Sequence, residues 1–571
     1  MTEMQQYAIW CEKATEDIDL INELKSIEGD ETAIQDRFYK NLEFGTGGLR
    51  GILSAGTARL NIYTIRRATQ GLADYVNEAF ENPSIAIAYD SRIKSDVFAK
   101  EAAKVLSANG IKVFLYSELM PTPMLSYAVR YLKCNAGIVV TASHNPAKYN
   151  GYKVYGDDGC QMTIDAANAV IEKINNVEMF GGAKLTDFDK ALAENKIEYI
   201  KSEVIASYLD EVKKQSIHTD LVEKSGLKVV YTPLNGTGNK PVRQILKNIG
   251  VADVVVVPEQ EMPDGTFKTC PFPNPEIEEA LHLGLLLSEK ENPDLLLATD
   301  PDCDRVGIAV PSDNGYVLFS GNEVGALLLE YICEEKTNLG TMPKNPIAVK
   351  TIVSTDIVKA IGEKYNVEII EVLTGFKFIG EQIGWLEEKG EENRYLFGFE
   401  ESYGYLAGTY VRDKDAVVAS MLICEMAAFY KTKGISLLTA RENLYKKYGV
   451  YYHSQKSFTC EGASGMQKMA ELMTMLRENS PKEIGGLKVL TIDDYISSQS
   501  LDTTTGEKSA LTLPKSEVLT FKLENNATVI IRPSGTEPKI KAYYTAIGET
   551  TAIAQETGEK LENSFKSILG F

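Results

Sequence analysis

Short apolar segments that end in polar turns recur along this chain of 571 residues. Three of them occupy residues 85–92, 228–236 and 347–355, and each leads from a strand-like run through a turn into a helix-like stretch. Their separation is much longer than the repeat of a solenoid. The pattern therefore predicts similar α/β domains in tandem, not a stacked array.

The two ends of the chain have a different pattern of apolar and polar residues. The first 40 or so residues are acidic and look helical, with a loose apolar stripe at roughly helical spacing formed by Trp10, Ile18, Ile21, Leu24 and Ile27. This pattern predicts a helical accessory segment. Beyond residue 452 a helical stretch, a polar loop at 498–507 and a strand at 527–531 predict a smaller α+β domain.

These changes in pattern predict an α/β protein of four domains, three of them similar mixed-sheet domains in tandem. The predicted boundaries are 1–205 including the helical extension, 206–319, 320–451 and 452–571. A hydrophobic content of 44% is sufficient for several buried cores.

Charge and targeting signals narrow the possible partners. The net charge of −20 argues against binding to nucleic acid or anionic membranes, because both require a basic surface. The chain has no apolar run near the roughly 18 residues of a membrane span, and its N-terminus lacks a signal-peptide pattern. We expect a cytoplasmic protein with eight reduced cysteines and infer no obligate protein partner.

The segment Thr141-Ala142-Ser143-His144-Asn145-Pro146 directly follows an apolar strand-like run at 137–140. This position is typical of a reactive group at the carboxyl end of a strand, and Ser143 would be the nucleophile. An ordinary turn, in which Ser and Asn cap backbone groups, is the alternative.

A glycine-rich turn at 44–51 ends close to Arg50, which makes this arginine a candidate anion contact. The turn is not a nucleotide-binding P-loop, because no Gly-Lys-Ser/Thr follows the glycines.

Asp300, Asp302 and Asp304 follow another strand-like run. On an extended backbone these side chains would share one face, and three carboxylates that converge in this way suit Mg2+. A calcium-binding EF-hand loop is excluded, because its sixth and twelfth positions would be Arg305 and Pro311 instead of Gly and Glu. A solvated acidic turn without a metal also fits this pattern.

Two further stretches carry polar side chains suited to a sugar phosphate. Glu400 and Ser402 lie in a glycine-flanked loop and could bind neighbouring sugar hydroxyls, and Thr374-Gly375 is a weaker candidate. The run from Arg532 to Lys539 combines an arginine, hydroxyls and an exposed glycine backbone, which together suit a phosphate. Each stretch also fits a simple loop or β-turn.

Together the Ser143, aspartate, Glu400 and Arg532 stretches resemble the α-D-phosphohexomutase family, which comprises the phosphoglucomutases and phosphomannomutases. The resemblance runs from Phe44 to about Lys541, with the motifs in the family's order, one per domain. It implies four domains around a central cleft, three of them alike, which agrees with the repetition of strands and turns.

The resemblance also implies the roles of individual residues. Ser143 would carry the phosphoryl group and bind Mg2+ with Asp300, Asp302 and Asp304. Arg50 and Lys153 would act as catalytic cations, with Lys153 the better acid/base candidate, and His144 would orient Ser143. The remaining residues expected to bind substrate are Arg305, Thr374, Gly375, Glu400, Ser402, Arg412, Lys414, Arg532, Ser534, Gly535, Thr536 and Lys539.

The activity implied is interconversion of glucose 1-phosphate and glucose 6-phosphate, with glucose 1,6-bisphosphate as intermediate and activator. Residues 147–153 resemble the phosphomannomutase/phosphoglucomutase branch, whereas 400–404 resemble the usual phosphoglucomutase loop. The mixture is most similar to the phosphoglucomutase-2-like branch, which also contains phosphopentomutases and a hexose-bisphosphate synthase. The sequence also leaves open a phosphomannomutase, a phosphatase and a non-catalytic phosphosugar-binding protein.

Overall fold

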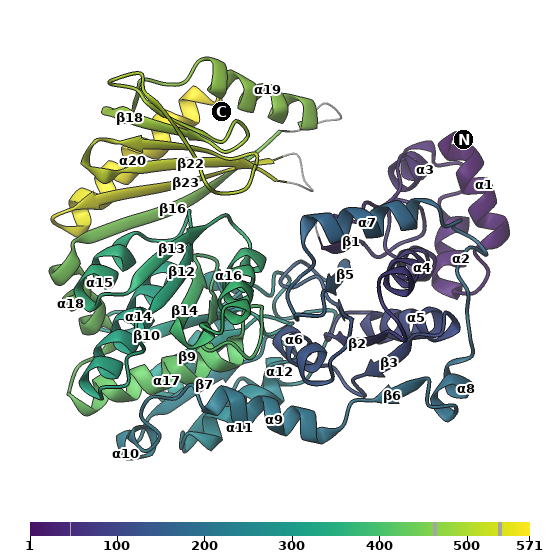
Figure 1. Cartoon of the computed structure of the whole chain (residues 1–571), viewed down its shortest axis with the longest axis horizontal. Helices are drawn as coiled ribbons and strands as arrows, with labels where there is room; N and C mark the ends of the chain where they lie inside the picture. Colours follow the sequence, from purple (N-terminus) through teal and green to yellow (C-terminus); the bar gives the residue numbers. More distant parts are fainter. Residues whose placement is uncertain (46, 461–464, 535–538) are drawn as a thin grey trace. The chain divides into compact units, whose positions relative to one another are not determined.

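A computed structural model describes residues 1–45, 47–460, 465–534 and 539–571. The chain divides into two compact units, the first formed by residues 1–321 and 376–436 and the second by 322–375 and 437–571. Figure 1 labels their helices and strands. None of the described helices is both long and apolar enough to cross a lipid bilayer. The eight cysteines are free thiols, and all except Cys11 are buried.

Three short helices begin the first unit: α1 (Glu3–Lys13), α2 (Ile18–Ser26) and α3 (Glu31–Phe38). The predicted helical segment is therefore broken twice. The side chains of Asp17 and Asp30 cause the breaks, because each accepts a backbone N–H and caps the next helix. Trp10 is buried against the rings of Phe38 and Tyr63, which attaches these helices to the first α/β domain.

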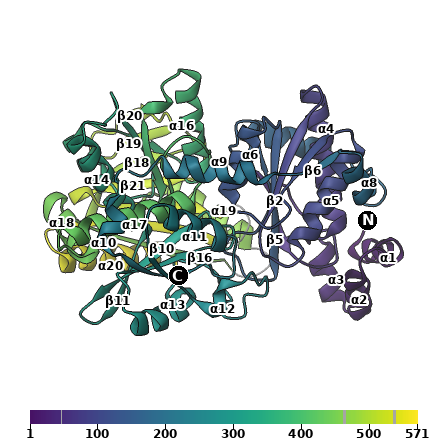
Figure 2. The ribbon, with the colours of Figure 1, turned by 90° about the horizontal axis from the view of Figure 1, so that it is seen from below.

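The first sheet has the strand order β1-β5-β4-β2-β3-β6. Its strands are β1 (Gly48–Ile52), β2 (Ser84–Tyr89), β3 (Lys112–Leu115), β4 (Ala136–Val140), β5 (Tyr149–Tyr155) and β6 (Ile197–Tyr199). Strands β4, β2, β3 and β6 are parallel, whereas β5 returns antiparallel to β4. Helices α5 and α6 lie on either side of β2 (Figure 2). The helices of this region are α4 (Ile62–Ala79), α5 (Ser95–Ala108), α6 (Thr122–Tyr131), α7 (Ile164–Asn175), α8 (Phe188–Ala193) and α9 (Ser202–Lys213).

The second sheet repeats this design with the order β11-β10-β9-β7-β8. Its strands are β7 (Lys228–Thr232), β8 (Asp253–Val256), β9 (Leu295–Thr299), β10 (Val306–Ser312) and β11 (Gly315–Phe319). Strands β9, β7 and β8 are parallel, and β10 returns antiparallel to β9. The helices are α10 (Leu221–Ser225), α11 (Asn239–Asn248), α12 (Pro258–Glu261) and α13 (Glu278–Glu291).

The third series of α/β elements is divided between the two units. The first unit contains α16 (Phe376–Glu388), α17 (Ala416–Thr432) and the antiparallel strands β14 (Tyr395–Glu400) and β15 (Gly404–Leu406). The second contains α14 (Gly321–Asn338) from Asn322 onward, α15 (Ile357–Tyr365), α18 (Leu437–Tyr448) and the parallel strands β12 (Ile347–Thr351) and β13 (Glu368–Val372). The predicted tandem α/β pattern is thus present in the structure.

The C-terminal part is rich in strands, with the order β16-β23-β22-β21-β18-β19-β20 and β17 paired to β18. These are β16 (Val450–Thr459), β17 (Glu483–Ile484), β18 (Leu487–Asp494), β19 (Gln499–Asp502), β20 (Lys508–Ala510), β21 (Leu519–Leu523), β22 (Thr528–Pro533) and β23 (Lys539–Gly548), together with α19 (Gly465–Glu478) and α20 (Thr551–Ile568). The polar loop predicted at 498–507 was partly wrong, because it includes β19. β19 pairs with β18 and with the edge strand β20, and its residues are exposed or half-buried, so the sequence shows no alternating apolar pattern there.

Candidate active site

Ser143 lies in the loop that joins β4 to its antiparallel neighbour β5. It is a buried, non-glycine residue with φ of 52°, in the left-handed region that costs free energy for such residues. Its N–H donates to Thr141 Oγ1 at 2.8 Å, and its hydroxyl donates to Asp300 Oδ2 at 3.1 Å. His144 Nδ1 lies 3.2 Å from the same hydroxyl. The side chain is therefore aimed at the acidic cluster by contacts on several sides.

The three aspartates follow β9 and are fully or almost fully buried. One carboxylate oxygen from each lies within 4.8 Å of the others. We expected the three side chains to converge along an extended backbone, and this expectation was wrong. Instead the chain turns back, with Cys303 at a φ of 53°, and Asp300 Oδ1 accepts the N–H groups of Asp304 and Arg305 at 3.0 and 2.9 Å.

Two lysines partly compensate this buried negative charge. Lys153 Nζ, from β5, lies 3.0 Å from Asp302 Oδ2, and Lys414 Nζ lies 3.1 Å from Asp304 Oδ2. Burial and the neighbouring carboxylates raise the pKa of Asp300 well above its usual value. Burial also tends to raise the pKa of Asp302, but the charges of Lys153 and Lys414 and the hydrogen bonds from Asp300 and Lys153 together outweigh it, and the net shift is downward.

The donor set fits a hard divalent cation. Asp302 Oδ1 and Asp304 Oδ1 are buried and have no hydrogen-bond partner among the described residues. Such oxygens are costly to bury unless a cation or donor satisfies them. Three carboxylates within reach of one point, with the Ser143 hydroxyl beside them, are suitable ligands for Mg2+.

Several buried side chains that we had not singled out from the sequence as site residues hold this cluster in place. Thr122, at the start of α6, donates from its hydroxyl to Asp302 Oδ2 at 3.0 Å and from its N–H to the Asp302 carbonyl at 2.9 Å. Tyr155 donates to Asp413 Oδ2 at 2.6 Å, and Asp413 Oδ1 lies 2.9 Å from Lys414 Nζ. The only sequence signal was the charged run at 412–415, of which Asp413 and Asp415 went unassigned.

The loop after β14 is tied to the aspartate loop. Arg305 Nη1 donates to the Ser402 carbonyl at 2.6 Å, and the N–H of Val306 donates to the Tyr403 carbonyl at 3.1 Å. Glu400, at the end of β14, is buried, and its charge helps to raise the pKa of both Lys414 and Arg305. The predicted sugar-binding loop therefore lies beside the predicted metal-binding loop.

The other predicted cations have different surroundings. Arg50 Nη1 donates to Asn145 Oδ1 at 3.5 Å, beside the Ser143 loop. The guanidinium of Arg412 is buried and contacts Glu387 and the carbonyls of Thr409 and Val411. These contacts do not bring Arg412 to the aspartates.

The predicted phosphate-binding residues belong to the second unit. Arg532 donates to the Tyr543 hydroxyl from Nε and Nη2 at 3.2 and 3.1 Å, and the N–H of Ser534 donates to the Lys539 carbonyl at 2.8 Å. Gly535 and Thr536 lie outside the described residues. Thr374 and Gly375 also belong to this unit, and Gly375 has a φ of 120°.

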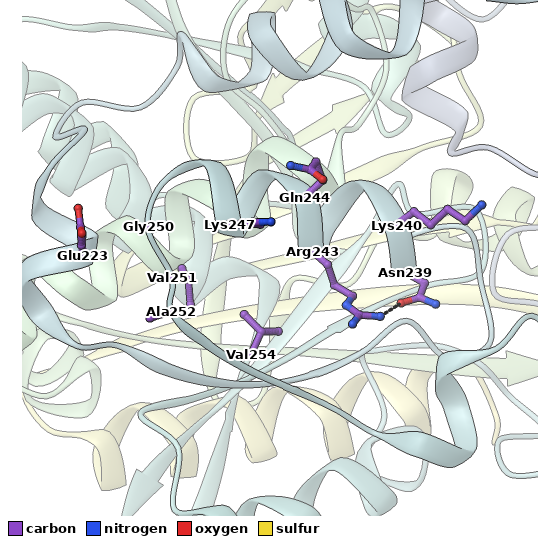
Figure 3. Close-up of a pocket in the computed structure, with 10 residues that line it drawn as sticks. All are labelled: Glu223, Asn239, Lys240, Arg243, Gln244, Lys247, Gly250, Val251, Ala252 and Val254. Atoms are coloured by element: carbon purple, nitrogen blue, oxygen red, sulfur yellow. Dashed lines mark hydrogen bonds between the residues drawn. The ribbon is translucent and has the colours of Figure 1, made fainter. Parts of the chain in front are cut away.

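A separate pocket of about 790 Å³ lies at α11 (Figure 3). Among its lining residues Lys240 and Arg243 form ion pairs with Glu118 and Glu261. The pocket includes none of the residues predicted to act in catalysis or binding.

Comparison with known proteins places the chain in a family. Models of domains I, II and III of phosphoglucomutase/phosphomannomutase, each an alpha/beta/alpha domain, match residues 41–180, 206–314 and 320–448. The chain is 37% identical over 538 residues to a phosphoglucomutase of Staphylococcus saprophyticus, covering 94% of this chain and 96% of that one. It is 38% identical over 541 residues to a phosphoglucomutase of Staphylococcus aureus, covering 94% of each.

Solved structures share the fold at lower identity. The Paramecium phosphoprotein parafusin, a phosphoglucomutase, has a TM-score of 0.68 at 19% identity and covers 93% of this chain and 95% of its own. A phosphoglucomutase/phosphomannomutase family protein of Burkholderia thailandensis has a TM-score of 0.66 at 17% identity, with 92% and 97% covered. The chain belongs to the phosphoglucomutases and phosphomannomutases, the α-D-phosphohexomutase family of isomerases.

Proposed function

We propose that this enzyme interconverts α-D-glucose 1-phosphate and glucose 6-phosphate through a phosphorylated Ser143. The observation that carries the proposal is the Ser143 hydroxyl, 3.1 Å from Asp300 and within a buried cluster of three carboxylates and two lysines. The choice of glucose rests on relatives named phosphoglucomutase at 37% and 38% identity.

In the proposed reaction, phosphorylated Ser143 transfers its phosphoryl group to the 6-hydroxyl of glucose 1-phosphate. The bond between phosphorus and the Ser143 oxygen breaks, a bond from phosphorus to the sugar oxygen forms, and the 6-hydroxyl loses a proton while the Ser143 oxygen gains one. The product is bound glucose 1,6-bisphosphate, which turns and returns its other phosphoryl group to Ser143. Glucose 1,6-bisphosphate would also act as an activator, because it can transfer a phosphoryl group to enzyme in which Ser143 is not phosphorylated.

Asp300, Asp302 and Asp304, with an oxygen on Ser143, would hold Mg2+. When bound, this ion would act as a Lewis acid on the phosphoryl oxygens and make Ser143 a better leaving group. The Oδ1 atoms of Asp302 and Asp304, which accept no hydrogen bond from the described residues, support this assignment.

Charged side chains around the triad would stabilise the transferring phosphoryl group. Lys153 and Lys414 add positive charge next to the carboxylates. Lys153 is our proposed acid/base group. Although burial opposes it, the charges of Asp302 and Asp304 raise the pKa of Lys153, so it would start as the acid that protonates the departing Ser143 oxygen. His144 would orient Ser143 as a neutral ring, because burial and the charge of Arg305 lower its pKa well below the usual value. Arg50, beside the same loop, would contact the transferring phosphoryl group.

The sugar and its second phosphate require further contacts. Glu400 would accept hydrogen bonds from sugar hydroxyls, and the Ser402 hydroxyl would donate to or accept from them. Thr374 and Gly375, which directly precede α16, are our further candidates for substrate binding. Arg532, Ser534, Gly535, Thr536 and Lys539 would bind the phosphate that does not react. Sugar phosphates and free cysteines both suit the cytoplasm, where we place the enzyme.

Substrate competition and one matched pair of variants test the proposal. Purified enzyme should convert glucose 1-phosphate at least about tenfold more efficiently than mannose 1-phosphate or ribose 1-phosphate, as expressed by kcat/KM.

The Ser143→Ala variant should lose turnover, and it should also lose the covalent phosphate that intact-mass measurement detects on the wild type. The control is Ser107→Ala, since Ser107 is also buried in the first domain and donates to the backbone carbonyls of Ala103 and Lys104 in its own helix. Full activity of Ser143→Ala would exclude the phosphoserine route, and preference for ribose 1-phosphate would exclude glucose as the main substrate.

A further inference from the structure

Arg92, just beyond the end of β2, binds the backbone of the Ser143 loop. Its guanidinium is fully buried. Nη1 donates to the carbonyls of Pro146 and Tyr149, each at 3.1 Å, and Nη2 donates to the carbonyls of Ser143 and Asn145. One side chain therefore fixes four carbonyl groups of the loop that carries the proposed nucleophile.

These contacts fix the peptide planes on which the direction of Ser143 depends. The N–H of Ser143 is held by Thr141, and its carbonyl is held by Arg92. Between these two contacts Ser143 adopts its left-handed conformation. A strained residue of this kind persists only where its surroundings determine the backbone. Without the contacts from Arg92, Ser143 can relax and its hydroxyl can leave the aspartate cluster.

Arg92 is itself held from several directions. Its Nε lies 3.3 Å from Asp90 Oδ2. Asp90 Oδ1 accepts the N–H of Arg92 at 2.9 Å and the hydroxyl of Ser95 at 2.7 Å. The ring of Phe267, from the second α/β domain, lies 5.1 Å from the guanidinium carbon. The guanidinium of Arg92 is thus held in one orientation, and it cannot reach a substrate because it is enclosed by protein.

We propose that Arg92 is a positioning residue for phosphoryl transfer, which sets the orientation of Ser143 through the loop carbonyls without touching the substrate. This inference rests on the proposed role of Ser143 as the phosphoryl carrier. A planar guanidinium with five donors is required for four carbonyls, so lysine, with three donors on one nitrogen, cannot replace it.

The test compares Arg92→Lys with Arg66→Lys in the full chain. Arg66 is a matched control, because it is also buried in the first domain, bonds to two carboxylates at 2.6 Å and lies over a tyrosine ring. Both variants lose a buried arginine fork, but Arg66 does not contact the Ser143 loop. We expect Arg92→Lys to lower kcat for glucose 1-phosphate about 30- to 100-fold relative to Arg66→Lys. KM should change by less than about threefold, because no substrate contact is removed.

The inference is overturned if kcat of Arg92→Lys stays within about threefold of Arg66→Lys, or if KM rises while kcat is unchanged. Should Arg92→Lys not fold, Asp90→Asn releases the fork from its carboxylate partner and is judged by the same two criteria. Melting temperatures of all variants separate lost stability from lost orientation. If the wild type and Arg66→Lys also lack mutase turnover, the proposed function has failed. If both are active and the Arg92 and Asp90 variants have the same kcat as they do, only the positioning role has failed.

Discussion

Thr122→Val should weaken binding of Mg2+ while leaving the fold intact. Thr122 is fully buried, and its hydroxyl donates to Asp302 Oδ2 at 3.0 Å. Valine has nearly the same shape but no hydroxyl, so this one hydrogen bond to a carboxylate is lost. The backbone N–H of residue 122 still donates to the Asp302 carbonyl at 2.9 Å, which keeps the two loops together.

The expected size follows from the kind of bond that is removed. A hydrogen bond to a charged group contributes about 1.5–3 kcal/mol, and loss of a contact that orients a metal ligand typically reduces metal affinity about 10- to 100-fold. The two ranges agree, since a tenfold change corresponds to about 1.4 kcal/mol. Lys153 remains as a partner of the same oxygen and limits the effect.

The assay is mutase activity as a function of Mg2+ concentration. The Mg2+ concentration for half-maximal activity should rise about 10- to 100-fold, whereas kcat at saturating Mg2+ should stay within about threefold. Thr69→Val is the matched control, because Thr69 is also fully buried and hydrogen-bonded, to the Ile65 carbonyl at 2.8 Å and to Tyr152 at 3.0 Å. If the two variants need Mg2+ concentrations within about twofold of each other, the reasoning about Asp302 is refuted.

Two further predictions concern the metal and the half-buried His453. A chelator should abolish mutase activity, and added Mg2+ should restore it. Mg2+ should also raise the melting temperature of the wild type but not that of Asp302→Asn. Activity that survives exhaustive chelation would contradict the metal assignment. Burial lowers the pKa of His453 to about 4. The unfolded chain therefore binds one more proton as the pH falls below the ordinary histidine pKa, and folding stability should drop by about 2 kcal/mol between pH 7 and pH 5 and by about 3 kcal/mol below pH 4. His453→Gln should remove this part of the pH dependence in urea unfolding of the unit that contains it. An unchanged slope would contradict a His453 ring that is neutral in the folded protein.

The sequence was informative where local order determines structure. The strands ending at Val140 and Thr299 were predicted from their β-branched and apolar runs, and the polar residues that follow them lie in loops of the site. The geometry of these loops was less predictable. Cys303 adopts a left-handed conformation that its residue type does not favour, so an extended arrangement of the aspartates was the natural but wrong expectation.

The supporting residues could not be found in this way. Thr122 begins a helix, where threonine normally serves as a cap, and its partner Asp302 lies 180 positions further along the chain. Arg92 resembles any polar residue after a strand, and only the folded chain brings it to the carbonyls of residues 143–149. A single sequence carries no signal for such distant pairs, because burial of a polar side chain depends on the tertiary structure.

Ser143 and Asp300 occupy the same place in two copies of one design, the turn between a central parallel strand and its antiparallel return. One copy presents a hydroxyl at this turn and the other presents carboxylates. In the proposed reaction the first domain supplies the phosphoryl carrier, and the second supplies the ligands of the metal that would offset the charge of the phosphoryl group. Neither domain holds the proposed reaction by itself, so turnover depends on the two turns keeping their places beside each other.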